Sequence, residues 1–290
     1  MGRLLKREWT YDKSSLWKGL LPGFILSVLV LAVYKIDKSI LLAMMRGIFR
    51  FPKAVYQLFG LEEGMATGNF GFYLLFFAMF VNFWLVWDNC RRMISGVYRD
   101  VRGDRLHSLM NQLYSKEQLA IGKYSGKLII SALQVTIWNL MLVLFAVVGN
   151  ELPQQRSQTV LRILQIYLIS ILIHIFFLSL SFFLAVWKGK RGKGFYPAGI
   201  LFGTLLVGNA WKIRELLVLL FQKLSVAESN ISKFERMFVW LNGLYWVSPL
   251  SWMNSLQLKS GGTFVLQILL LLVGAAIFVT LGVRLYGPEK

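Results

Sequence analysis

The residues of this chain most able to make specific contacts gather in a polar stretch, residues 91–127, that separates two apolar blocks. The stretch is basic and punctuated by glycine. A polar segment of this size in an otherwise apolar chain indicates docking, in which a soluble partner binds and pushes on the adjoining helices. The candidate docking residues are Arg99, Asp100, Arg102, Gly103, Leu106, Leu109, Ser115 and Lys116.

A second set of candidates consists of polar residues inside the apolar blocks: Asn82, Asn139, His174 and Asn209. Interhelical hydrogen bonds worth about 1 kcal/mol each account for such residues. They could instead line a substrate path. His174 is ionisable, which makes it a functional candidate by default inside a membrane. The other interpretation is a neutral histidine bonded to a neighbouring helix.

Motifs for catalysis, metal binding or cofactor binding are absent from the sequence. The segment GKYSGKL at 122–128 has three residues between its glycines and Leu128 where a phosphate loop needs Ser or Thr. We therefore interpret it as helix packing, with Lys123 and Lys127 reaching lipid headgroups. The two histidines lack a metal-binding context. Cys90 is the single cysteine, so an internal disulfide is excluded.

Composition places the chain in a membrane. Its residues are 56% hydrophobic, compared with about 45–50% in soluble domains. The net charge is +18, but the basic residues lie between apolar blocks, where anionic lipid headgroups attract them. We therefore expect the lipid bilayer as a partner and no nucleic acid.

The sequence predicts an all-α, single-domain membrane protein with six transmembrane helices. Each predicted span is long enough to cross about 30 Å of hydrocarbon. The spans cover Leu16–Tyr34, Phe70–Asn89, Leu128–Val148, Val160–Trp187, Phe195–Trp211 and Thr263–Tyr286.

Shorter elements are predicted around these spans. Residues 1–15 are amphipathic and predict a helix lying in the membrane interface, with a turn or kink at Pro22–Gly23. Residues 39–61 predict one or two interfacial helices. The outer stretch 212–262 contains two short apolar segments, at 216–224 and 237–252. Two re-entrant helices are favoured there over an additional span, which leaves the alternative of seven or eight spans open.

Lysine and arginine placement predicts the orientation of the chain. The connections at 1–15, 91–125, 188–195 and 287–290 have about twice the Lys and Arg density of the other set. Both termini are therefore expected in the cytoplasm of a multi-pass protein in the cell membrane.

The 91–127 stretch contains a series of local signals. Ser115 is predicted as a helix N-cap, with Gln118 completing a capping box. The stretch resembles the cytoplasmic loop of ABC exporter permeases, matching it in type and order at Asp100, Gly103, Leu106, Leu109, Ser115, Lys116, Gly122 and Lys123. Asp104 replaces the usual threonine of that family, and Leu113 stands where proline is common. The segments 52–60 and 247–250 also resemble the family.

The resemblance implies a permease subunit that pairs with a second permease chain and docks a separate ABC ATPase on the 91–127 loop. ATP and magnesium would bind the partner subunit, and this chain would hold no cofactor and not be an enzyme itself. The implied cargo is a hydrophobic or amphipathic peptide, drug or lipid-like molecule, moved outward. The alternatives are a channel or assembly protein without an ATPase, and a membrane-embedded lipid-modifying enzyme.

Overall fold

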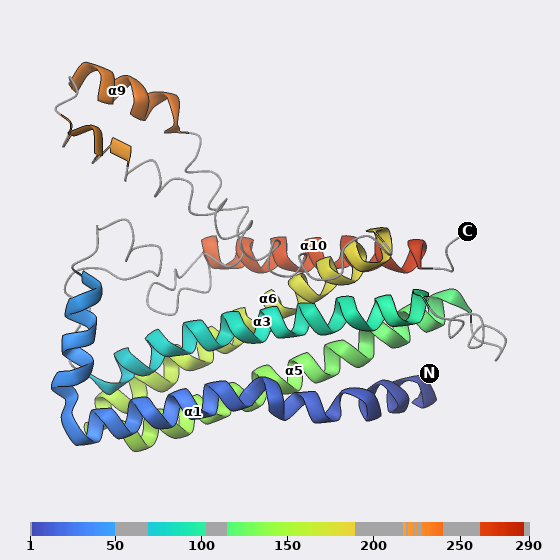
Figure 1. Cartoon of the computed structure of the whole chain (residues 1–290), viewed down its shortest axis with the longest axis horizontal. Helices are drawn as coiled ribbons and strands as arrows, with labels where there is room; N and C mark the ends of the chain where they lie inside the picture. The colour runs from blue at the N-terminus through green and yellow to red at the C-terminus, as the bar shows by residue number, and fades with distance from the viewer. Residues whose placement is uncertain are drawn as a thin grey trace.

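The computed structural model describes residues 2–49, 69–102, 115–188, 217–218, 220–222, 224, 228–239 and 262–286. Within these ranges the chain is helical and contains no strand. The named helices are α1 (Gly2–Phe49), α3 (Phe70–Arg102), α5 (Lys116–Gly149), α6 (Pro153–Lys188), α9 (Glu228–Met237) and α10 (Gly262–Leu285). Figure 1 shows α1, α3, α5, α6 and α10 as a bundle of long helices, with both termini at one end.

Five of these helices are long and apolar enough to cross a membrane: α1, α3, α5, α6 and α10. They contain the predicted spans one to four and six, and the all-helical, multi-pass prediction is confirmed in this form. The predicted fifth span, Phe195–Trp211, lies outside the described residues. Each helix from α1 to α6 extends beyond its predicted span, because polar residues at its ends find partners on neighbouring helices.

Contacts between side chains fix the direction of each helix. α5 runs parallel to α1, since Gln134 contacts Leu16 near one end of the bundle and Glu151 pairs with Lys35 at the other. α6 and α10 also run parallel to each other. Phe176 packs on Gly274, and Phe182 packs on Gly282. The bundle therefore has α1 and α5 running one way and α3, α6 and α10 running the other (Figure 1).

α1 departs from the prediction in where it breaks. Residues 2–15 and the first span form one continuous helix through Pro22, so a separate interfacial helix is not confirmed. α1 stays helical through Pro22, and Gly23 beside it packs tightly against Val81 and Trp138. The break occurs at Asp37, whose backbone is extended (φ −156°, ψ 100°). Its carboxylate accepts the Ser39 N–H at 2.8 Å and so caps the helix that restarts there.

After Asp37 the last part of α1 runs across the end of the bundle (Figure 1). Leu41 and Met45 are buried one turn apart, whereas Ile40 and Met44, also one turn apart, are exposed. This segment confirms a helix in the predicted 39–61 region as far as Phe49. Residues 50–61 lie outside the described ranges.

α9 is a polar helix within the outer stretch 212–262. It lies between the two apolar segments that were predicted to be re-entrant, and the prediction did not include it. Ile231 is buried, and Phe234 packs against Phe221 and Phe238. Figure 1 shows α9 far from the two termini.

Candidate functional site

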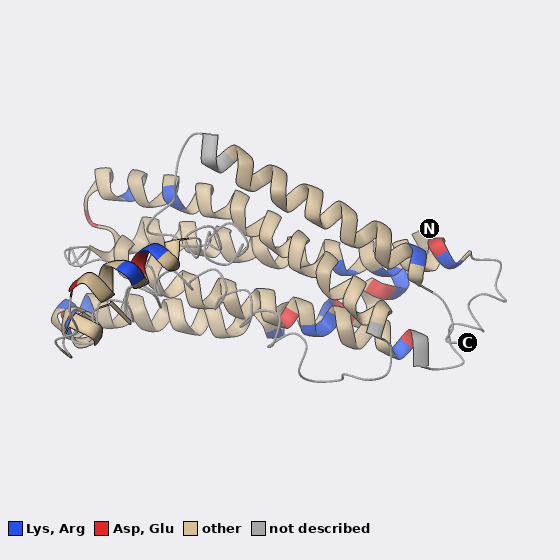
Figure 2. Ribbon diagram, turned by 90° about the horizontal axis from the view of Figure 1, so that it is seen from above, with Lys and Arg blue, Asp and Glu red and all other residues tan. Residues whose placement is uncertain are grey.

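Charged residues of the helices gather mainly toward the end of the bundle that carries both termini, with a smaller group at the other end (Figure 2). We call the first the inner end. Here the beginning of α1, the end of α3 and the beginning of α5 meet. Their ionic contacts form a network buried between the helices, with members that lie less than a tenth exposed: Glu8, Asp88, Arg92, Asp100, Lys123 and Lys127.

Two pairs of opposite charge join α1 to α5. Glu8 and Asp12 are one turn apart on α1, and Lys123 and Lys127 are one turn apart on α5. Lys123 Nζ lies 3.0 Å from Glu8, and Lys127 pairs with Asp12. Because the two helices run parallel, the same four-residue spacing brings both pairs into register.

Lys123 also joins α3 to this arrangement. Its Nζ lies 2.9 Å from Asp100, in addition to its contact with Glu8. One ammonium group thus bridges carboxylates on two helices. Tyr286, which follows α10, is buried within electrostatic reach of Asp100 and Glu8. The start of α1, both helices that flank residues 103–114 and the end of α10 therefore meet around Lys123.

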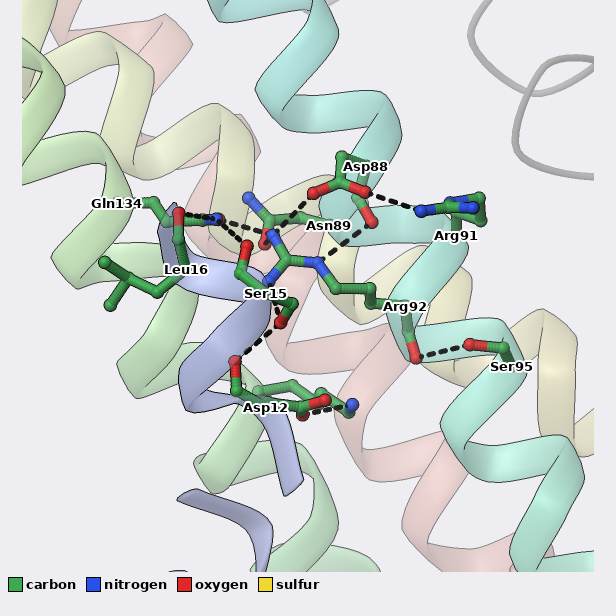
Figure 3. Close-up of polar contacts among 10 residues, drawn as sticks. Asp12, Ser15, Leu16, Asp88, Asn89, Arg91, Arg92, Ser95 and Gln134 are labelled. Atoms are coloured by element: carbon green, nitrogen blue, oxygen red, sulfur yellow. Dashed lines mark hydrogen bonds and ion pairs between the residues drawn. The ribbon is translucent and has the colours of Figure 1, made fainter. Parts of the chain in front are cut away.

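Arg92 is the centre of the second half of the network (Figure 3). Its guanidinium lies 2.9 Å from the Asp88 carboxylate and donates to Ser15 Oγ at 2.9 Å. It also donates to the side-chain oxygens of Asn89 and Gln134. Gln134 donates in turn to the Leu16 carbonyl of α1. A planar group with five donors suits such a site, because it bonds three helices at once.

Glycines make the space that these long side chains need. A Cβ on Gly96 would lie 3.0 Å from Lys127 Cε and 3.1 Å from Lys123 Cε, so both lysine stems pass over this bare backbone. A Cβ on Gly126 would lie 2.6 Å from Glu8 Cβ, which shows how closely α1 approaches α5. At Gly19 it would meet Gln134 at 2.5 Å. Gly19 and Gly23, four residues apart on α1, thus both lie where neighbouring helices come close.

The predicted docking residues fall into groups with different surroundings. Arg99, Ser115 and Lys116 are exposed. Asp100 is buried in its ion pair with Lys123, so its carboxylate faces the bundle. The Ser115–Gln118 capping box is confirmed, with both hydrogen bonds present. Arg102 is the last residue of α3, and its side chain is outside the described set, as are Gly103, Leu106 and Leu109.

Two interpretations from the sequence are wrong at this site. Lys123 and Lys127 do not extend to headgroups, because buried carboxylates on α1 and α3 bind them. Glu8 and Asp12 were not predicted as site residues. Their four-residue spacing, matched by that of the two lysines, was the available signal. Asp88 pairs within α3 with both Arg91, at 3.1 Å, and Arg92, at 2.9 Å.

The residues predicted as pathway candidates lie inside the bundle. Asn82, Asn139 and His174 are all buried, on α3, α5 and α6 respectively. His174 Nδ1 lies 2.7 Å from the Ser170 carbonyl, so this histidine bonds its own helix and not a neighbouring one. Asn209 is outside the described residues.

The opposite end of the bundle, which we call the outer end, carries the exposed Lys35–Glu151 pair, but its contacts between α3 and α5 are made by neutral side chains. Asn150 accepts the Gly71 N–H at 3.1 Å and donates to the Ala146 carbonyl at 2.9 Å. It therefore ties the end of α5 to the beginning of α3. Gly149 faces the Phe70 ring, and Tyr34 packs edge-on against the same ring.

The chain matches no protein-family model, no curated protein and no solved structure. Among the described residues, no group of three or more His, Cys, Asp or Glu side chains is placed to hold a metal ion.

Proposed function

We propose that this chain is the membrane-spanning permease subunit of an ATP-driven ABC transporter. Two such chains pair, and a separate ATPase subunit docks on the 91–127 segment of each. The proposed direction is export, and the cargo a hydrophobic or amphipathic peptide, drug or lipid-like molecule. The proposal includes six spans, cytoplasmic termini and a location in the cell membrane.

The observation that carries this proposal is the double ion pair of Lys123. Lys123 binds Glu8 of α1 and Asp100 of α3 while it sits on α5 itself. A force applied to the segment between α3 and α5 is therefore transmitted to α1 as well. Transmission of this kind needs rigid elements whose contacts have two arrangements. A cation that binds two carboxylates at once can keep one contact while the other opens, which meets that requirement.

Helix length supports the same function. α3 has 33 residues and α5 has 34, which corresponds to about 50 Å each at 1.5 Å per residue. About 30 Å suffices for the hydrocarbon. If the spans begin at the outer end, the surplus projects at the inner end as two helical stems for a docking segment. Residues 2–15 lie against these stems, where an elbow helix would be needed.

The direction of α6 and α10 supports the six-span arrangement. Because these two helices are parallel, the connection between them starts at one end of the bundle and finishes at the other. An odd number of crossings between residues 189 and 261 is required, and the predicted span Phe195–Trp211 supplies one. The proposed re-entrant helices would then lie on the outer side, together with α9.

The test is retention of ATPase activity by the purified chain. The full chain is isolated in mild detergent from the cells that produce it naturally, and ATP hydrolysis is measured in the purified sample. Lys116→Glu reverses an exposed charge on the proposed docking surface at the inner end. The ATPase subunit should therefore dissociate from this variant, and most of the ATP hydrolysis should be lost from the purified sample. Lys233→Glu, on exposed α9 at the outer side, is the matched control and should retain it. A sample without ATP hydrolysis, or equal retention by both variants, would contradict the proposal.

A further inference from the structure

Several buried polar atoms in the interior of the bundle have no hydrogen-bonding partner among the residues that the structure describes. Both side-chain atoms of Asn82 are in this state, although the residue is only 1% exposed. The same holds for Asn139 Oδ1, His174 Nε2 and Asn89 Nδ2. Inside a membrane protein each such group costs several kcal/mol unless something bonds to it. The position of these atoms in the bundle indicates what kind of group can form hydrogen bonds with them.

On α6, the polar atoms face the space between α3 and α5. Ser170 and His174 are one turn apart on one face of the helix. Phe177, on one side of this face, contacts α3 through Cys90. Tyr167, on the other side, contacts α5. The Ser170–His174 face therefore points between these two neighbours.

The polar residues of α3 point into the same space. Asn82 and Asn89 are seven residues apart and so share a face. Next to that face, Cys90 contacts α6 on one side, and Gly96 meets the lysines of α5 on the other. The two asparagines thus lie between the α5-facing and α6-facing sides of α3.

α5 completes the enclosure. Ser131 and Asn139 flank Val135 on its buried side. Gln134, on one side of them, bonds Arg92 of α3, and Thr136, on the other, bonds α6. The Ser131 hydroxyl and the Asn139 carbonyl are therefore directed between α3 and α6. Neither has a hydrogen-bonding partner.

These residues also lie at related heights along the bundle. The contacts Gly71–Thr159 and Cys90–Phe177 set the register of α3 and α6, and place Asn82 level with Ser170. The contacts of Asn150 and Gln134 with α3 place Asn139 within a turn of the same level. Asn89 and Ser131 lie further toward the inner end, where Arg92 and Gln134 begin the ion network.

The chemistry of the space is neutral and mixed. The Ser170 carbonyl can only accept, so His174 Nδ1 carries the proton, and Nε2 of the neutral ring is an acceptor. Asparagine amides and serine hydroxyls supply donors and further acceptors. We propose that α3, α5 and α6 enclose a polar seam that binds ordered water, leading from the Arg92 network to the middle of the bundle and lined by Asn82, Asn89, Ser131, Asn139, Ser170 and His174. This site is independent of the proposed transport function.

The test uses the two histidines of the chain. The His107→Gln variant leaves His174 as the sole histidine. The full-length chain, labelled with ¹⁵N-histidine, is placed in phosphatidylcholine nanodiscs, and solid-state NMR measures magnetisation transfer from water to the His174 ring. We expect an unprotonated, hydrogen-bonded Nε2 and rapid transfer. Transfer to the ring no faster than proton spin diffusion through the protein alone would overturn the proposal.

Two further variants distinguish water from dry packing. Asn82→Leu removes two polar atoms from the seam and should reduce water transfer to His174 severalfold. In a dry interior the same variant would leave transfer unchanged and raise the unfolding temperature, which would also overturn the proposal. Thr136→Val is the control, because the Thr136 hydroxyl already bonds Ala132 and Tyr167 on another face of α5. It should leave transfer unchanged.

Discussion

The two ends of the bundle are joined by different kinds of contact. At the inner end, buried carboxylates and cations connect α1, α3 and α5. At the outer end, the amide of Asn150 and the ring of Phe70 connect α3 and α5 without charge. An ion pair in a low-dielectric site is strong only while both partners are present, and loss of one leaves an unpaired buried charge. The hydrogen bonds of Asn150 and the ring packing of Phe70 at the outer end, by contrast, favour a single arrangement of the helices.

This difference indicates that the two ends of the bundle have different structural roles. The outer end fixes the register of the helices, because its contacts depend on close steric fit. At the inner end Lys123 has two carboxylate partners, so one contact can open while the other remains. A bundle fixed at one end and ionically coupled at the other suits the transmission of movement from a docked partner.

The largest expected effect comes from removing the shared cation. Lys123→Met leaves the Asp100 carboxylate buried without its ion-pair partner and Glu8 with Arg7 alone, and should lower the free energy of unfolding by about 3–5 kcal/mol. Denaturation in mixed detergent micelles measures this loss. Lys35→Met is the control. It removes an exposed ion pair, in which Lys35 lies 3.9 Å from Glu151, and should change the free energy of unfolding by at most about 1 kcal/mol.

A triple variant sharpens this result. Lys123→Met combined with Glu8→Gln and Asp100→Asn removes the unpaired charges as well, and should recover much of the lost stability. If Lys123→Met and Lys35→Met were equally mild, the ionic description of the inner end would be wrong.

A smaller effect is expected from crowding at the outer end. In Gly149→Ala the new methyl carbon would lie 2.1 Å from a Phe70 ring carbon, so the ring must move. Overpacking of this kind costs about 1–3 kcal/mol. Gly47→Ala is the matched control, since nothing lies within 4 Å of its added carbon. Thermal unfolding of both variants should show a loss only for Gly149→Ala, and equal curves would contradict the packing described here.

The smallest effect concerns the neutral cap of the outer end. Asn150→Ala removes the oxygen that accepts the Gly71 N–H and should cost about 1 kcal/mol. Ser157→Ala, which removes an exposed hydroxyl bonded within α6, should cost less. Chemical denaturation compares the two. A loss for Asn150→Ala as large as that for Lys123→Met would remove the distinction between the ends.

The fold was largely predictable because its signals are local. Long apolar blocks predicted the spans, and the spacing of Ser115 and Gln118 predicted a cap that the structure contains. Asp88 and Arg92 are one turn apart, so their pairing followed from helix geometry alone. The break of α1 at Asp37 was not predicted, and the helix continues through Pro22, next to the packing of Gly23 on α3 and α5.

The inner-end network was not predictable in the same way. Glu8 and Lys123 are far apart in the sequence, and each resembles a solvated charge on an amphipathic segment. Only the parallel register of α1 and α5 shows that they meet. His174 is a different case, because its partner is the Ser170 carbonyl, four residues earlier on the same helix.

The continuity of α1 has a consequence for how this molecule tolerates change. Residues 2–36 form one continuous helix, about 50 Å long at 1.5 Å per residue. Near its start Glu8 pairs with Lys123 of α5, and near its end Tyr34 packs on Phe70 of α3. One residue inserted between Glu8 and Tyr34 would rotate one of these side chains by about 100° around the helix axis relative to the other. The sequence between Glu8 and Tyr34 should therefore accept substitutions on its lipid-facing side far more readily than any change in its length.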